Sequence, residues 1–270
     1  MNPTDAIENK VKTLTPGTLP NPLYRVELVK EGRKRFYQAT AHDGSWQHNY
    51  QGTTGISGML DDGKSFGFAK AASGIAVEAV RAKLLKVGPE PIVLEPEVID
   101  GLLAGCATAY QKEWNAKRDR GTDYHELLEA RFRGLPYTTT PDFEEMWAKL
   151  QDKLHAEAID IVSAEVPCAS IIHKFGTKVD GVGKLMGDWG VVDWKTSRFT
   201  SSEHFFQVGG GSAQAFTETY GVTAKWAKIL RWDFAGKYWE VKTIINLERA
   251  LSGLLALRQV KDTIEEELFI

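Results

Sequence analysis

Residues 176–197 constrain the fold most, because they are expected to form two strands joined by a glycine-rich turn. Alternate residues of a strand point to the same face, so Asp193 and Lys195 project together while Trp194 points into the core. Asp180 ends the first strand. We therefore expect Asp180 and Asp193 to face each other where the strands approach, with backbones about 5 Å apart.

Two carboxylates at this spacing repel each other unless a positive charge lies between them. A divalent cation satisfies both, and all-oxygen ligation with open water positions suits Mg²⁺ or Mn²⁺. Lys195 beside such an ion could hold or deprotonate a water for attack on a phosphodiester. The alternative is that Asp193 and Lys195 form only a structural ion pair. The apolar lead-in, Val191 and Val192, and the second aspartate argue against it.

Two further residues are candidates for the same site. Glu165, on the preceding expected strand, could supply a third carboxylate, although an exposed strand glutamate would give the same pattern. His125 and Glu129 are four residues apart on an expected helix and share a face. The sequence His-Glu-x-x-Glu lacks the second histidine of the zinc peptidases, so we reject that class.

The order of elements predicts an α/β sheet with helices packed on it, preceded by a mostly helical N-terminal part. We expect a turn-rich stretch at residues 42–54, a helix that starts at Gly121, and strands from residue 159 onward. A helix at 203–220 would contain a run of three glycines, which is unfavourable in a helix interior. The proposed divisions are an arm at 1–21, a hairpin and helical subdomain at 22–114, and the main α/β unit at 115–270.

Composition excludes several classes of protein. Only two cysteines occur, Cys106 and Cys168, so a disulfide framework or a four-cysteine metal centre is impossible, and we expect buried free thiols. The net charge of -3 means that any positive field for nucleic acid must be local. No apolar run approaches the roughly 18 to 20 residues that span a bilayer, and no secretory signal is evident. We expect a cytoplasmic protein without a membrane partner.

Five short motifs, in order along the chain, resemble those of the PD-(D/E)-x-K nuclease superfamily in its RecB-like branch. The set is similar to that of phage-encoded exonucleases and of the mitochondrial genome maintenance exonuclease. The resemblance spans roughly residues 115 to 245. Its motifs are Gly121 with His125, Glu165, the Gly-Thr-Lys-Val-Asp segment at 176–180, the Val-Val-Asp-Trp-Lys-Thr segment at 191–196, and Gln207.

The resemblance implies a restriction-endonuclease-like core, in which helices flank a central mixed sheet, and a Mg²⁺- or Mn²⁺-dependent deoxyribonuclease, most simply an exonuclease. DNA ends, single-stranded or duplex, would be the substrate. A role in recombination, repair or replication follows, with a recombination or single-strand-binding protein as a partner, in a phage-type setting. It also implies a role for each motif residue: metal binding by Asp180, Asp193, the Trp194 carbonyl, Glu165 and His125, water positioning by Lys195, and support from the next helix by Gln207.

One departure from the motifs leaves an alternative open. The helix motif of the family is Gln-x-x-x-Tyr, and Gly211 occupies the tyrosine position here. A catalytically inactive DNA-binding or recombination accessory protein with the same fold is therefore the second hypothesis. A structural or interaction protein with an ion-paired strand is the third. The iron–sulfur cysteines of some family members are missing, so no cluster is expected.

Overall fold

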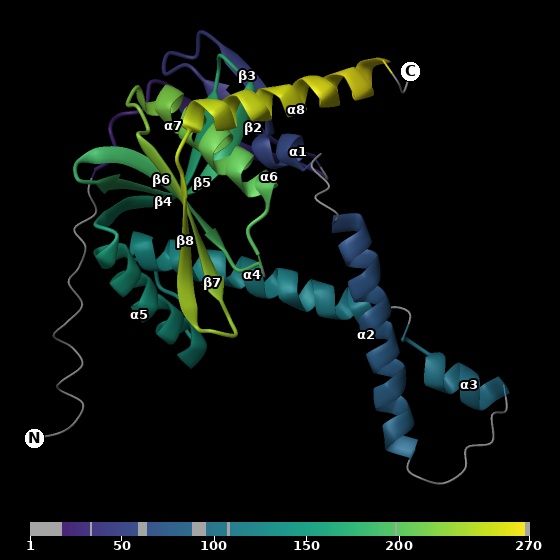
Figure 1. Ribbon diagram of the computed structural model, residues 1–270. Helices are drawn as coiled ribbons and strands as arrows, with labels where there is room; N and C mark the ends of the chain where they lie inside the picture. The colour runs from purple at the N-terminus through teal and green to yellow at the C-terminus, as the bar shows by residue number, and fades with distance from the viewer. Residues whose placement is uncertain are drawn as a thin grey trace, which may run out of the picture.

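An open mixed β-sheet forms the centre of the protein (Figure 1). The computed structural model describes residues 18–32, 34–58, 64–87, 96–106, 109–197 and 199–267. Within these residues eight strands pair in the order β1-β2-β3-β5-β6-β7-β8, and β4 pairs with β5 outside this path. The strands are β1 (Arg25–Glu31), β2 (Lys34–Thr40), β3 (Gln47–Gly52), β4 (Ile159–Ser170), β5 (Phe175–Leu185), β6 (Asp188–Lys195), β7 (Trp226–Asp233) and β8 (Tyr238–Ile244).

Strand β5 is a branch point of the sheet. Along one side it pairs with β4 over its whole length. On the other side, Phe175 and Gly176 pair in parallel with the end of β3, whereas residues 181–185 pair with the antiparallel β6. No described strand pairs with residues 177–180 on that side. The sheet therefore divides there, at the end of the Gly-Thr-Lys-Val-Asp motif.

Helices cover both faces of the sheet (Figure 1). Their bounds are α1 (Thr53–Ser57), α2 (Lys64–Val87), α3 (Pro96–Leu103), α4 (Ala109–Arg133), α5 (Pro141–Ala156), α6 (Ser202–Phe205), the π-helical segment η2 (Phe206–Ser212), α7 (Ala213–Tyr220) and α8 (Leu247–Glu267). One buried cluster joins α4 and α5 to the sheet, and another joins η2, α7 and α8 to it. Strand β7 supplies Leu230 to the first and Ile229 to the second, as expected for a strand buried on both faces. The α/β architecture is thus confirmed.

Local sequence explains several element boundaries. Thr140 caps α5 by accepting a hydrogen bond from the Phe143 backbone N–H, with a proline at the first helical position. Asn246 caps α8 by accepting a hydrogen bond from the Arg249 N–H at 2.8 Å. Met186 and Gly187 both have positive φ, which suits the tight turn between β5 and β6.

The N-terminal part differs from the mostly helical expectation, because it contributes three strands to the sheet before its helices begin. The stretch expected to be turn-rich contains β3 and the first two residues of the short helix α1. Strand β3 gave no sequence signal because its residues are mostly polar and exposed, and only Tyr50 is buried. It is held by backbone pairing with β2 and β5 rather than by an apolar face.

Helix α4 also departs from expectation, since Gly121 lies inside it and does not begin a new helix. A Cβ on Gly121 would lie 3.1 Å from the Thr196 Oγ1 atom. The glycine therefore allows α4 to approach the loop that follows β6. This close approach offsets the weak helix propensity of glycine at that position.

The three consecutive glycines are buried in η2 and allow close packing by two other helices. A Cβ on Gly210 would lie 2.5 Å from the Ala250 carbonyl oxygen of α8. A Cβ on Gly211 would lie 2.6 Å from the Thr53 side chain of α1. The run that is unfavourable for helix propensity is thus explained by packing, and the helix accommodates it as a π-helical segment.

The remaining expectations concern the cysteines, membrane-spanning helices, the N-terminal arm and the divisions of the chain. Both cysteines are free and buried, as predicted. Among the described helices, none is long and apolar enough to cross a membrane. The predicted arm lies largely at residues 1–17, which are outside the described ranges. The proposed divisions of the chain and its location in the cell stay predictions.

We expect Gly210→Ala to lower the free energy of unfolding by about 1–3 kcal/mol, because the added methyl group meets backbone atoms of α8. The matched control is Gly74→Ala in α2, where a Cβ would meet no atom within 4 Å. This control should raise stability by about 0.5–1 kcal/mol through helix propensity. Urea unfolding followed by circular dichroism measures both. Equal effects of the two substitutions would contradict the packing role of the glycine.

Candidate functional site

The Asp180 carboxylate lies where β5 loses its pairing with β6. The last ladder pair on this side is Gly181 with Val192. Beyond it, the Trp194 backbone N–H donates a hydrogen bond to Asp180 Oδ2 at 3.0 Å. A side chain thus takes over from the backbone in holding the two strands together. The Asp180 side chain is 12% exposed, so its carboxylate is largely removed from water.

Glu165 comes from β4, on the opposite side of β5, and its backbone is in the left-handed region with φ of 56°. A non-glycine residue there is strained by about 1–2 kcal/mol, and such strain concentrates at functional sites. The side chain is only 6% exposed. Its Oε1 atom lies 3.9 Å from His125 Nδ1, and Lys178 forms an ion pair with Oε2.

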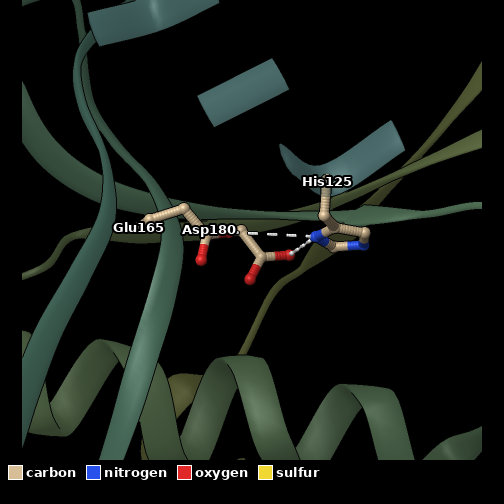
Figure 2. A group of neighbouring side chains, drawn as sticks. All are labelled: His125, Glu165 and Asp180. Carbon is tan, nitrogen blue, oxygen red and sulfur yellow. Dashed lines mark ion pairs between the residues drawn. The ribbon is translucent and has the colours of Figure 1, made fainter. Parts of the chain in front are cut away.

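His125 reaches the same place from α4. Its Nδ1 atom lies 3.5 Å from Asp180 Oδ2, and Figure 2 shows the imidazole directed toward both carboxylates. Gly121 lies one turn earlier on the same helix, and its contact with Thr196 brings this turn of α4 close to the end of β6. The Gly-x-x-x-His spacing therefore has a physical explanation. The glycine allows α4 to lie close to the end of β6, and the histidine one turn later then reaches the carboxylates.

The three residues His125, Glu165 and Asp180 could together hold a metal ion. One ligand atom from each lies within 4.8 Å of the others, and all three residues are partly buried. Two carboxylates and one imidazole are suitable ligands for a divalent cation. The predicted site residues from the helix, β4 and β5 are thus brought together by the fold.

Asp193 and Lys195 form a second pair beside this cluster, on β6. The Lys195 Nζ atom lies 2.7 Å from Asp193 Oδ2 and donates a hydrogen bond to Oδ1 at 2.9 Å. Asp193 is buried, and its Oδ2 atom accepts no well-aligned hydrogen bond. Trp194 between them is buried in the core, as the strand alternation predicted.

The ionisable side chains of the site shift one another's pKa values. Burial and the Asp193 carboxylate raise the pKa of Asp180 to about 6. Burial lowers the pKa of His125, but Asp180 and Glu165 outweigh it, so the net direction is upward. Burial opposes the charged form of Lys195 as well, yet the Asp193 carboxylate raises its pKa overall. Lys195 is therefore an ammonium group in this arrangement.

The pKa of Glu165 shifts in the opposite direction from the pKa of Asp180. Burial raises the pKa of its carboxyl group, but the nearby His125 imidazole and the ion pair with Lys178 outweigh burial, so the pKa is lowered. Two neighbouring carboxyl groups thus differ in how readily they take a proton. Such a separation is common where carboxylates have distinct roles in one site.

Gln207 contacts helix α1. It lies at the start of η2, and its Nε2 donates to Thr54 Oγ1 of α1 at 3.2 Å. At the position of the family tyrosine, Gly211 packs against Thr53 of the same helix. The π-helical segment η2 therefore supports α1 through Gln207 and Gly211.

Lys178 is a site residue that the sequence analysis missed. Its ammonium group contacts Glu165, and its position two residues before Asp180 on β5 places both on one face of the strand. The same alternation rule that joined Asp193 with Lys195 could have found it. A basic residue two positions before the motif aspartate was the available signal.

Comparison with known proteins finds similarity to solved structures. No protein-family model matches the chain, and no curated protein matches its sequence. Two solved structures of LHK-Exo, an alkaline exonuclease from Laribacter hongkongensis, are distantly similar. The first is 14% identical with a TM-score of 0.27, and the match covers 54% of this chain and 84% of that one. The second, a complex with dAMP, is 15% identical with the same TM-score and coverage.

The raised pKa of Asp180 predicts a pH-dependent stability in metal-free protein. A carboxyl group whose pKa is higher in the folded state stabilises the fold at low pH, and this contribution is lost as pH rises through the folded-state value. Compared with Asp180→Asn, the wild type should therefore lose about 1–3 kcal/mol of unfolding free energy between about pH 4 and about pH 7. Urea unfolding with EDTA at several pH values measures this. A difference between the two proteins that stays constant with pH would contradict it.

Proposed function

We propose that this protein is a Mg²⁺- or Mn²⁺-dependent deoxyribonuclease of the PD-(D/E)-x-K type. The observation that carries the proposal is the convergence of His125, Glu165 and Asp180 from α4, β4 and β5 at metal-ligand spacing. A structural ion pair on β6 would need only Asp193 and Lys195 and would leave this convergence unexplained. Three acidic side chains, Glu165, Asp180 and Asp193, lie close together despite desolvation and mutual repulsion, and a bound cation accounts for this better.

The residues fit such an ion. His125, Glu165 and Asp180 would hold it, and Asp193 adds a buried carboxylate oxygen without a well-aligned hydrogen bond. The family resemblance adds the backbone carbonyl of Trp194 as a further ligand. When bound, the ion would polarise a phosphate oxygen and lower the pKa of a coordinated water.

The ammonium group of Lys195 supplies the other half of the chemistry. Because Asp193 keeps it protonated, Lys195 would donate hydrogen bonds to the attacking water and to the negative charge that develops on the phosphate. Between the two roles open to a lysine here, holding a water or deprotonating it, the geometry supports holding. Asp193 would orient Lys195 as well as bind the ion.

DNA is the proposed substrate, and we propose exonuclease action at single-stranded or duplex ends. The wider role would be recombination, repair or replication of phage-type DNA in the cytoplasm, with a recombination or single-strand-binding protein as partner. The rival of an inactive accessory protein was motivated by Gly211. Because that glycine has a packing partner in Thr53, its presence is explained without loss of catalysis.

Cleavage of linear DNA with Mg²⁺ or Mn²⁺ tests the proposal. We expect Asp180→Ala and Asp193→Ala each to lower the rate by at least about 100-fold, because each removes a carboxylate that would hold the metal ion, and Asp193 would also orient Lys195. The matched control is Asp188→Ala, an exposed aspartate at the start of β6, which should keep wild-type activity. Circular dichroism confirms that each variant is folded.

Equal activity of wild type and Asp193→Ala, or no cleavage with any metal, would overturn the nuclease proposal. Retained DNA binding without cleavage would instead support the accessory protein. End-labelled linear DNA compared with covalently closed circular DNA distinguishes the mode of action: an exonuclease degrades the first and leaves the second intact.

A further inference from the structure

The site contains a second lysine whose surroundings differ from those of Lys195. Lys178 lies in the part of β5, residues 177–180, that pairs with no described strand on the side of the branch. Its ammonium group forms an ion pair with Glu165 Oε2. The Lys178 side chain is 40% exposed, whereas the Glu165 side chain is 6% exposed. The solvent-accessible ammonium group of Lys178 is thus paired with the buried carboxylate of Glu165.

Glu165 is shared between two partners. Its Oε1 atom faces the His125 imidazole, and its Oε2 atom faces Lys178. A divalent ion held by His125, Glu165 and Asp180 would lie within a few ångströms of the Lys178 ammonium group. Like charges at such a distance disfavour each other, so ion binding and the Lys178–Glu165 pair compete for the same carboxylate.

Lys178 is more exposed than Lys195 and has fewer contacts within the site. Lys195 is 17% exposed and contacts both oxygens of Asp193. Lys178 is 40% exposed and reaches Glu165 from the solvent side, so water can hydrate its ammonium group if the ion pair opens. Once released, the Lys178 ammonium group would lie beside residues 177–180 of β5, next to the place where a phosphate would bind.

We propose that Lys178 is a displaceable counter-ion: it neutralises Glu165 in the metal-free protein, is released when a divalent cation binds, and then contacts a phosphate of the bound nucleic acid. This inference rests on the proposed nuclease function. It assigns the two lysines separate tasks, with Lys195 fixed at the reacting centre and Lys178 alternating between carboxylate and substrate. Loading of the metal and binding of the substrate would then favour each other.

Metal titration of the full chain by isothermal calorimetry tests the first half. With Mn²⁺, Lys178→Met should bind the ion about 3- to 10-fold more tightly than wild type, because the competing cation is gone. The control Lys184→Met, on the same strand but stacked on Trp189, should bind it as wild type does. In a Glu165→Gln background the effect of Lys178→Met should disappear, since the contested carboxylate is absent.

The salt dependence of DNA binding tests the second half, with a fluorescent oligonucleotide and Ca²⁺ or EDTA. In Ca²⁺, Lys178→Met should lower the slope of log affinity against log salt by about one phosphate contact, about 0.7–0.9. In EDTA the slopes should agree. Unchanged or weaker Mn²⁺ binding by Lys178→Met, or equal slopes in Ca²⁺, overturns the inference. Neither outcome affects the nuclease proposal, which is decided by the cleavage assay with Asp180 and Asp193 variants.

Discussion

The hydrogen bond from the Trp194 N–H to the Asp180 carboxylate is the contact on which the rest of the site depends. It continues the β5–β6 interaction past the point where backbone pairing ends, and it orients one carboxylate oxygen toward His125. The same strand end carries Asp193 and Lys195 on either side of the Trp194 backbone. Because Trp194 is anchored in the core, Asp193 and Lys195 next to it in the chain are held in place.

The site brings acidic and basic side chains together where water has limited access. Three carboxylates face an imidazole and two ammonium groups, and each carboxylate has a partner in the metal-free state. The partners are unequal: Asp193 has a largely buried lysine, Glu165 has a more exposed lysine and the edge of His125, and Asp180 has the same histidine and a backbone amide. Asp180 is therefore the carboxylate with the least compensation, which agrees with its raised pKa.

Sequence alone predicted the α/β class and named side chains that the fold brings together, because strand alternation and motif order can both be read from the chain. Strand alternation placed Asp193 with Lys195, and motif order joined His125 and Glu165 to them. It could not give β3, whose polar residues carry no pattern of burial, or the passage of α4 through Gly121, which depends on a contact with Thr196. Both were decided by pairing and packing between segments far apart in the chain.

The junction between β3 and β5 has a consequence for how the protein folds. Only two residue pairs connect these strands, and they join segments separated by nearly half the chain. Closing so long a loop costs entropy before the contact repays it, whereas β4, β5 and β6 are neighbours in sequence. The β4–β6 meander should therefore form first and the β1–β3 unit should dock late. Because α1 follows β3 directly, the Thr54 contact with Gln207 would be among the last parts of the molecule to assemble.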